Sequence, residues 1–89
     1  MPFVYILESQ NTGRWYIGMT ENIEERLKEH NAGRVRSTKG YRPYSVIYTE
    51  EYPDATSARK REIQIKKSGI IRKQLKEKLR PHTAPSSNG

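Results

Sequence analysis

The sequence predicts an α+β fold in which a three-stranded antiparallel β-sheet is flanked by helices, in the order β-β-α-β-α-α. Two observations support this prediction. Two apolar segments with strand-like alternation flank Asn11-Thr12-Gly13, a sequence typical of a hairpin turn. Farther along, helix-capping signals surround one more strand-like run, residues 44–52. A chain of 89 residues is expected to form one domain around one core.

Both N-terminal segments are predicted to be strands with two apolar faces. Residues 3–7 alternate Phe3, Tyr5 and Leu7 with Val4 and Ile6, and residues 15–19 alternate Trp15, Ile17 and Met19 with Tyr16 and Gly18. Pairing the two segments would bring the phenols of Tyr5 and Tyr16 close together. Because glycine weakens a strand, Gly18 predicts a bend or a close approach of the backbone.

A helix is predicted after the hairpin. Asn22 fits an N-cap, Glu25 completes a capping box with it, and Gly33 fits the C-terminal stop. A basic loop that contains Gly40 comes next, over residues 34–43. The next strand is expected to place Tyr44, Val46 and Tyr48 on one face and Ile47 on the other.

Two more helices are predicted toward the C-terminus. Asp54 or Thr56 caps a helix that runs to about Lys67, Ser68-Gly69 interrupts it, and a last helix spans roughly residues 70–79. Residues 81–89 have almost nothing to bury and are expected to be a disordered tail. The folded domain is therefore expected to cover residues 1–80.

Composition excludes several classes of function. The sequence contains no cysteine, so neither a disulfide framework nor a thiolate metal site is possible. Hydrophobic residues make up 33% of the chain, which predicts a thin core without a deep pocket. No apolar run approaches the roughly 20 residues of a membrane span, and the N-terminus lacks a signal-peptide pattern. We therefore expect a cytoplasmic protein with no membrane partner.

Positive charge is concentrated in the C-terminal third. Residues 1–58 hold seven Lys and Arg against eight Asp and Glu, whereas residues 59–89 hold ten against two. A concentrated basic surface is typical of proteins that bind polyanions such as nucleic acids. The plain alternative is a solvated helix surface that keeps the protein soluble. A membrane-surface helix is disfavoured because the stretch lacks a broad apolar face with bulky aromatics.

Tyr5 and Tyr16 are candidate catalytic residues only in combination with other groups of the chain. Taken alone, a strand tyrosine is more often a packing residue with a solvated hydroxyl. With a pKa of about 10, it becomes a useful base only beside a metal or cationic side chains that stabilise its phenolate. Cleaving a phosphodiester also needs a cation to offset charge on the phosphate oxygens. The first helix and the C-terminal helices supply such groups.

The first helix carries an arginine and a histidine at helical spacing. His30 shares with Leu27 the face turned toward the sheet, and Arg26 lies four residues before His30 at the edge of that face. A guanidinium there suits a phosphate, and His30 could orient a tyrosine or a nucleophilic water. Alone, His30 would be a helix-end residue favoured by the dipole, and Arg26 a solvated charge paired with Glu29 or Glu25.

Glu62 is the only acidic residue within residues 59–76. Helical geometry puts it on the inward side with Ala58 and Ile65, where an unpaired carboxylate is costly. An ion pair with Lys66 one turn later is the structural explanation. The functional explanation is a site for one divalent cation, because a single carboxylate plus waters and phosphate oxygens suits Mg²⁺.

These residues resemble the GIY-YIG nuclease superfamily. Val4-Tyr5-Ile6 and Tyr16-Ile17-Gly18 correspond to its two name-giving motifs, with Val4 in place of the first glycine, and Arg26, His30 and Glu62 complete the set. The resemblance covers most of residues 3–67. With Thr38, Arg42-Pro43 and Glu62–Lys66 included, the chain is most similar to the small standalone bacterial members.

The resemblance implies a metal-dependent DNA endonuclease of DNA repair or recombination that uses one Mg²⁺ or Mn²⁺ ion. The implied catalytic residues are Tyr5, Tyr16, Arg26, His30 and Glu62, with Glu62 holding the metal; which tyrosine is the base stays open. Some members have a lysine where this chain has Met19, and an asparagine for which Gln74 is the nearest counterpart. Nucleic-acid contacts are expected from Arg34, Arg36, Lys39, Arg42, Arg59, Lys66, Lys67, Arg72 and Lys73.

Two other functions compete with this one. A nucleic-acid-binding module could keep the scaffold without turnover, and a protein-interaction or RNA-associated domain could use the basic helices. The resemblance leaves open whether the DNA is branched or single-stranded and whether a separate DNA-targeting protein takes part. Binding without cleavage in Mg²⁺ and Mn²⁺ would favour the binding module.

Overall fold

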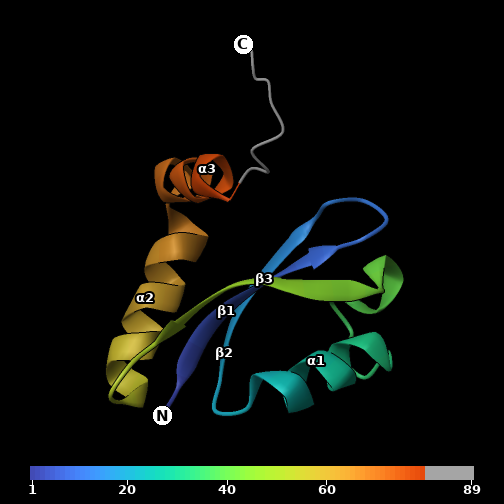
Figure 1. Ribbon diagram of the computed structural model, residues 1–89, viewed down its shortest axis with the longest axis horizontal. Helices are drawn as coiled ribbons and strands as arrows, with labels where there is room; N and C mark the ends of the chain where they lie inside the picture. Colours follow the sequence, from blue (N-terminus) through green and yellow to red (C-terminus); the bar gives the residue numbers. More distant parts are fainter. Residues whose placement is uncertain (80–89) are drawn as a thin grey trace.

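Three strands form one antiparallel sheet in the order β2-β1-β3, so that β1 is central. The computed structural model describes residues 1–79 (Figure 1). The strands are β1 (Phe3–Ser9), β2 (Trp15–Thr20) and β3 (Tyr44–Glu51); the helices are α1 (Ile23–Asn31), α2 (Ala55–Lys67) and α3 (Gly69–Lys78), with a 3₁₀ turn η1 (Lys39–Tyr41). This architecture confirms the predicted α+β fold and its order β-β-α-β-α-α. The predicted domain end at residue 80 and the predicted tail over residues 81–89 lie outside the described residues.

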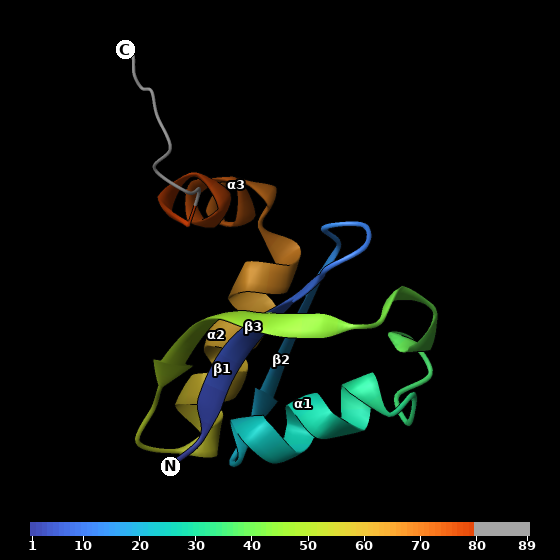
Figure 2. The ribbon, with the colours of Figure 1, turned by 45° about the vertical axis from the view of Figure 1, so that its right-hand side comes forward.

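The two faces of the sheet pack against different helices, α1 on one side and α2 with α3 on the other (Figures 1 and 2). Tyr5 and Leu7 of β1 face α1, where they pack with the buried Tyr44 and with Leu27 and other partly buried residues. The alternate residues of β1, Val4 and Ile6, face the other way. They form the larger core with Ile17, Ala58, Ile65 and Leu75. The period-two alternation of β1 therefore serves two packed layers, as the sequence predicted.

The caps explain where the helices begin and end. The Asn22 side chain accepts a hydrogen bond from the Glu25 backbone N–H at the start of α1, while the Asn22 N–H donates to the Thr20 hydroxyl. Gly33, with φ of +79°, follows the end of α1 as predicted. Asp54 caps α2, and Ser68 both ends α2 and caps α3.

One strand prediction is wrong. Tyr48 does not share a face with Tyr44 and Val46; it packs with Ile47 against the α2 and α3 side. The cause is a register shift, since Leu7 pairs with Val46 while its neighbour Ile6 pairs with Tyr48. Ile47 is thus the extra residue of a β-bulge, which reverses the facing of every later residue in the strand.

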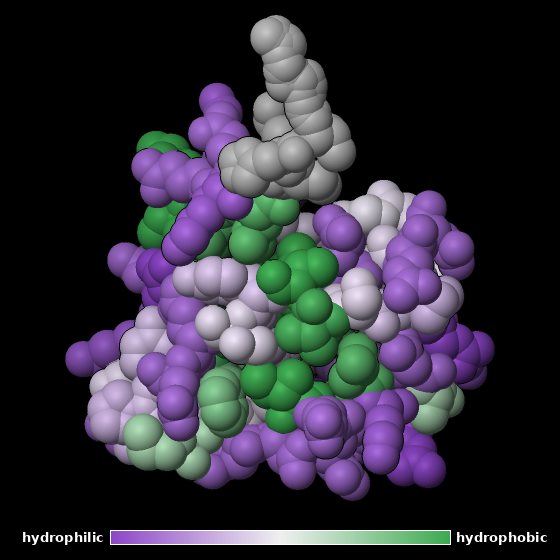
Figure 3. All heavy atoms as spheres, viewed as in Figure 1, coloured by the Kyte–Doolittle hydropathy of each residue, from purple (hydrophilic) through white to green (hydrophobic). Residues whose placement is uncertain are grey.

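Hydrophilic residues cover much of the molecular face seen in Figure 1, and hydrophobic ones gather toward its middle (Figure 3). The large hydrophobic residues that are exposed within residues 1–79 are Met1, Ile63 and Ile70. None of the helices described here is both long and apolar enough to cross a membrane.

Candidate active site

The hairpin brings Tyr5 and Tyr16 together over Gly18. Tyr5 pairs with Gly18 in the β1–β2 ladder, and the centroids of the two phenol rings are 6.3 Å apart. A Cβ atom at Gly18 would lie 2.5 Å from the Tyr5 Oη atom and 3.1 Å from Cε2 of Tyr16. This close approach, one of the two possibilities that the sequence raised for Gly18, makes room for both rings.

His30 is buried beside both tyrosines. Its Nε2 atom lies 3.3 Å from the Tyr5 hydroxyl oxygen, and its ring centroid is 4.7 Å from that of Tyr16. On the other side of the ring, Nδ1 lies 2.8 Å from Oγ1 of Thr38, a buried residue of the loop after α1. Burial and the nearby Arg26 charge lower the pKa of His30 to about 4, so the imidazole is neutral at pH 7.

Arg26 lies at the edge of this cluster. Its guanidinium is held by Glu29, with Nη1 2.7 Å from Oε1, which is one of the pairings that the sequence suggested. The hydrogen bond to Glu29 and then the nearby Tyr5 raise the pKa of Arg26, and the charge of Tyr16 adds to the effect. Burial raises the pKa of Tyr5, and the nearby Arg26 guanidinium opposes the shift. The guanidinium therefore lies close enough to influence Tyr5 electrostatically, while its direct hydrogen bond is to Glu29.

Glu62 lies on the inward side of α2, as helical spacing predicted, with 15% of its side chain exposed. Both of its oxygens face cations: Lys66 Nζ is 2.9 Å from Oε2 and Arg59 Nε is 3.8 Å from Oε1. The Glu62 charge makes only a minor contribution to the raised pKa of Tyr5. Within residues 1–79 the hydrogen bonds and ion pairs of Glu62 are to Arg59 and Lys66, so the structure does not join it by contact to Tyr5, Tyr16, Arg26 or His30.

This donor set fits a hard divalent cation held weakly. Residues 1–79 contain no group of three or more His, Asp or Glu side chains that would form a closed metal cage. Glu62 offers one carboxylate, with the exposed cations Arg59 and Lys66 beside it. Mg²⁺ commonly binds through one or two carboxylates, retained waters and substrate phosphates. The chemistry therefore fits an ion bound together with substrate, with Glu62 as its protein ligand.

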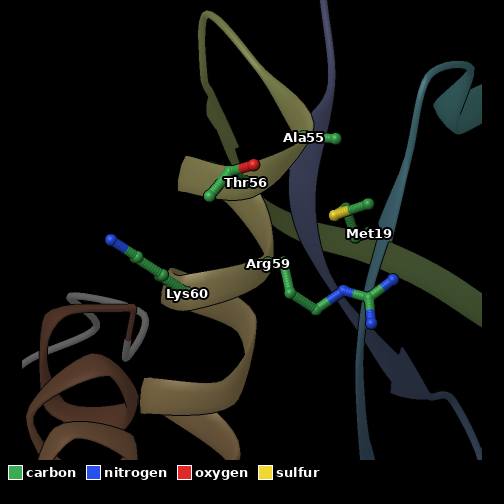
Figure 4. Close-up of a pocket in the computed structure, with 5 residues that line it drawn as sticks. All are labelled: Met19, Ala55, Thr56, Arg59 and Lys60. Carbon is green, nitrogen blue, oxygen red and sulfur yellow. The ribbon is translucent and has the colours of Figure 1, made fainter.

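A shallow hollow of about 300 Å³ opens between β2 and the start of α2 (Figure 4). Its lining joins two apolar or small side chains, Met19 and Ala55, with Thr56, Arg59 and Lys60. Arg59 extends across the hollow toward β2 in Figure 4 and is also the residue that approaches Glu62. The hollow thus adjoins Glu62, and Met19, the residue after the second motif glycine, forms part of its wall.

Most of the basic residues named from the sequence have exposed side chains. Arg34, Arg36, Lys39 and Arg42 lie on the connection between α1 and β3, and Arg59, Lys66, Lys67 and Lys73 on α2 and α3. Arg72 differs because it is half-buried. It donates from Nη1 to the backbone carbonyl of Ile65 at 2.9 Å and also to that of Lys66, so it caps the end of α2.

A second polar cluster, which the sequence did not predict, lies on the opposite face of the sheet. Glu50 of β3 accepts hydrogen bonds from the hydroxyls of Tyr48 at 2.5 Å and Tyr52 at 2.6 Å. Arg61 of α2 donates to both Glu50 oxygens, at 2.9 and 3.1 Å. Every charge in this cluster has a partner, so its evident role is to fasten α2 to the sheet.

Comparison with known proteins identifies the class of domain that this fold and cluster define. Residues 1–70 match the GIY-YIG catalytic domain, and the chain belongs to this nuclease-type family, whose members are typically endonucleases. Nucleases of this family generally use a divalent metal ion. The predicted resemblance is thereby confirmed.

The relatives are small proteins of the UPF0213 group. The chain is 43% identical over 67 residues to a UPF0213 protein from Syntrophus aciditrophicus, covering 73% of this chain and 76% of that protein. It is 33% identical over 75 residues to one from Halobacterium salinarum, covering 83% and 96%. The solution NMR structure of the UPF0213 protein BH0048 from Bacillus halodurans is similar with a TM-score of 0.54 and 29% identity, covering 93% of this chain and 89% of that one.

Proposed function

We propose that this protein is a metal-dependent DNA endonuclease that hydrolyses phosphodiester bonds at the Tyr5, Tyr16, Arg26, His30 and Glu62 cluster. The observation that carries the proposal is the convergence of two phenols, a neutral imidazole and a guanidinium from β1, β2 and α1 around the space that Gly18 leaves open. Glu62, whose charge has a minor influence on the pKa of Tyr5, would supply the carboxylate that a divalent ion needs.

The geometry suggests different tasks for the two tyrosines. The Tyr5 side chain is 1% exposed and hydrogen-bonded to His30, so it cannot contact a substrate without moving. Tyr16 is only partly buried and its ring lies against His30. We therefore assign Tyr16 to the nucleophilic water and Tyr5 to the support of His30 and Arg26.

The reaction then proceeds by in-line displacement. The water oxygen forms a bond to phosphorus, and the bond from phosphorus to the leaving sugar oxygen breaks. The water proton passes to the Tyr16 oxygen as the hydroxyl proton of Tyr16 passes to solvent. Arg26 offsets negative charge on the phosphate oxygens, and the leaving oxygen takes a proton from solvent. A divalent ion at Glu62, Mg²⁺ or Mn²⁺, would supply further charge neutralisation at the phosphate.

The exposed basic residues of α2, α3 and the loop before β3 are proposed to follow the DNA backbone. Arg59 and Lys60 lie at the hollow beside Glu62, where a nucleotide flanking the scissile phosphate would meet both cations. One observation favours the alternative, a binding module without turnover: Lys66 and Arg59 already occupy both oxygens of Glu62. The two functions differ in whether a metal ion converts binding into cleavage.

The test is incubation with branched, single-stranded and duplex DNA, with and without Mg²⁺ or Mn²⁺. Arg26→Ala should lower the single-turnover rate by about 10²–10³, as loss of one transition-state donor does. Tyr5→Phe and Tyr16→Phe should also lower it, with the larger loss at Tyr16. Tyr52→Phe is the matched control, because it removes the same atom from the opposite face of the sheet. Equal rates for all of these variants would refute the proposed site. Binding that needs no metal and is not followed by cleavage would support the alternative, a binding module without turnover.

A further inference from the structure

Thr38 is a buried polar residue to which the proposed mechanism gives no role. It is 1% exposed, and it lies in the loop eight residues after His30. Its Oγ1 atom is 2.8 Å from Nδ1 of His30 and donates to the backbone carbonyl of Val35 at 3.2 Å. Thr38 thus links the imidazole to a fixed backbone acceptor.

The contacts form one chain of hydrogen bonds from Tyr5 through His30 and Thr38 to the Val35 carbonyl. The Val35 end of the chain fixes its direction. A carbonyl oxygen can only accept, so the single hydroxyl proton of Thr38 points at Val35, and Oγ1 of Thr38 accepts from Nδ1 of His30. The imidazole proton therefore lies on Nδ1, and the Tyr5 O–H donates to Nε2.

The reverse direction would disturb the site. If Nε2 carried the proton, Nδ1 would need a donor that Thr38 does not offer, because the Thr38 proton points at Val35. The Tyr5 hydroxyl would also lose Nε2 as its acceptor. Because the pKa of His30 is about 4, the imidazole is neutral at pH 7 and carries one proton, on either Nδ1 or Nε2.

We propose that Thr38 is a positioning residue that holds His30 in the Nδ1–H tautomer, which leaves Nε2 free to accept a hydrogen bond from the Tyr5 hydroxyl. The inference about the site's geometry stands on contacts alone, whereas its effect on hydrolysis rests on the proposed function. Thr38 itself touches neither phosphate nor metal in this assignment; it acts through His30 and Tyr5.

The tautomer can be measured directly by long-range ¹H–¹⁵N correlation of the imidazole. The sequence has two histidines, so a His82→Gln background leaves the His30 signals alone. We expect the Nδ1–H form in that background, a shift toward Nε2–H in Thr38→Val, and restoration in Thr38→Ser, which keeps the hydroxyl. Thr49→Val, at an exposed threonine of β3, is the matched control and should leave the tautomer unchanged.

The second readout is single-turnover cleavage in Mg²⁺. Thr38→Val should lower the rate roughly five- to tenfold, the equivalent of one net hydrogen bond, without changing DNA affinity, and Thr38→Ser should recover it. An Nε2–H tautomer in the Thr38-containing protein overturns the inference, as does an unchanged tautomer or rate in Thr38→Val. If Thr38→Val does not fold, the tautomers of the background protein and of Thr38→Ser still test whether Thr38 holds the Nδ1–H form. If neither the background protein nor any variant cleaves DNA, the proposed function is refuted, while the tautomer measurement still tests the role of Thr38.

Discussion

The Tyr5 hydroxyl lies directly over Gly18, its partner across the β1–β2 ladder, at a distance that no other residue type at position 18 would permit. Tyr5 in turn reaches His30 and Arg26 from this position. Gly18 therefore contributes by lacking a side chain, because the Tyr5 hydroxyl lies only 2.5 Å from the position where a Cβ atom would be.

Gly18→Ala should destabilise the fold. The added Cβ would lie 2.5 Å from Tyr5 Oη and 2.7 Å from Cζ, in a site where Tyr5 is buried. Overpacking of this kind typically costs about 1–3 kcal/mol in the free energy of unfolding. Urea denaturation would measure it, with Gly40→Ala as control, since a Cβ at Gly40 meets no atom within 4 Å. Equal stabilities of the two variants would contradict the prediction.

Lys66→Gln should strengthen metal binding in the absence of DNA. Lys66 is 2.9 Å from Oε2 of Glu62, so it would compete with a divalent ion for this carboxylate, and the lysine side chain is exposed to solvent. Such helical pairs are worth about 0.2–0.5 kcal/mol, so the gain in Mg²⁺ affinity should be about twofold. Titration followed at the Glu62 amide resonance would measure it. The neighbouring exposed Lys67→Gln should bind Mg²⁺ like the unchanged protein, and a weaker affinity in Lys66→Gln would count against the metal site.

DNA affinity should fall steeply as salt rises. Each neutralised phosphate contributes about −0.9 to the slope of log affinity against log salt on duplex DNA. Charge reversal at Lys66, Lys67 and Lys73 together should weaken binding to all sequences alike and flatten that slope. Arg72 is left intact because it caps α2. A slope near zero before substitution would mean that the basic charge serves solubility alone.

Glu50 should stabilise the fold against acid. Burial works against its ionisation, but hydrogen bonds from Arg61, Tyr48 and Tyr52 lower the pKa of Glu50 to about 2, below its ordinary value of 4.5. The stabilisation is therefore complete above about pH 4.5 and is lost as the pH falls toward 2. Urea denaturation at pH 6 and pH 3 should show a smaller acid loss in Glu50→Gln than in Glu51→Gln, its exposed neighbour. Identical losses would contradict this assignment.

Local patterns were enough to predict the strands, the caps and the facing of most residues. The alternation in β1 and β2, the N-caps at Asn22 and Asp54 and the break at Ser68 depend on residues close together in the sequence, and each formed as expected. The inward side of Glu62 and its pairing with Lys66 followed from helical spacing alone.

Features that depend on distant contacts were not predictable in this way. The hydrogen bond between Thr38 and His30 requires the loop after α1 to fold back on the helix, and no spacing rule specifies that path. The Arg72 cap of α2 depends on the angle between two helices. Glu50 and Arg61 meet only because α2 crosses β3 at that point.

The bulge at Ile47 determines which helix layer each part of β3 contacts. Before the bulge, Val46 packs on the α1 side of the sheet; after it, Tyr48 and Glu50 lie on the α2 side. Without the bulge, the same sequence would turn Glu50 away from Arg61, and α2 would lose its polar attachment to the sheet. Removing Ile47 itself would preserve that parity, whereas removing Thr49 would invert it. The number of residues in β3 thus determines which side chains face α2, and we expect β3 to tolerate a deletion at Ile47 but not one at Thr49.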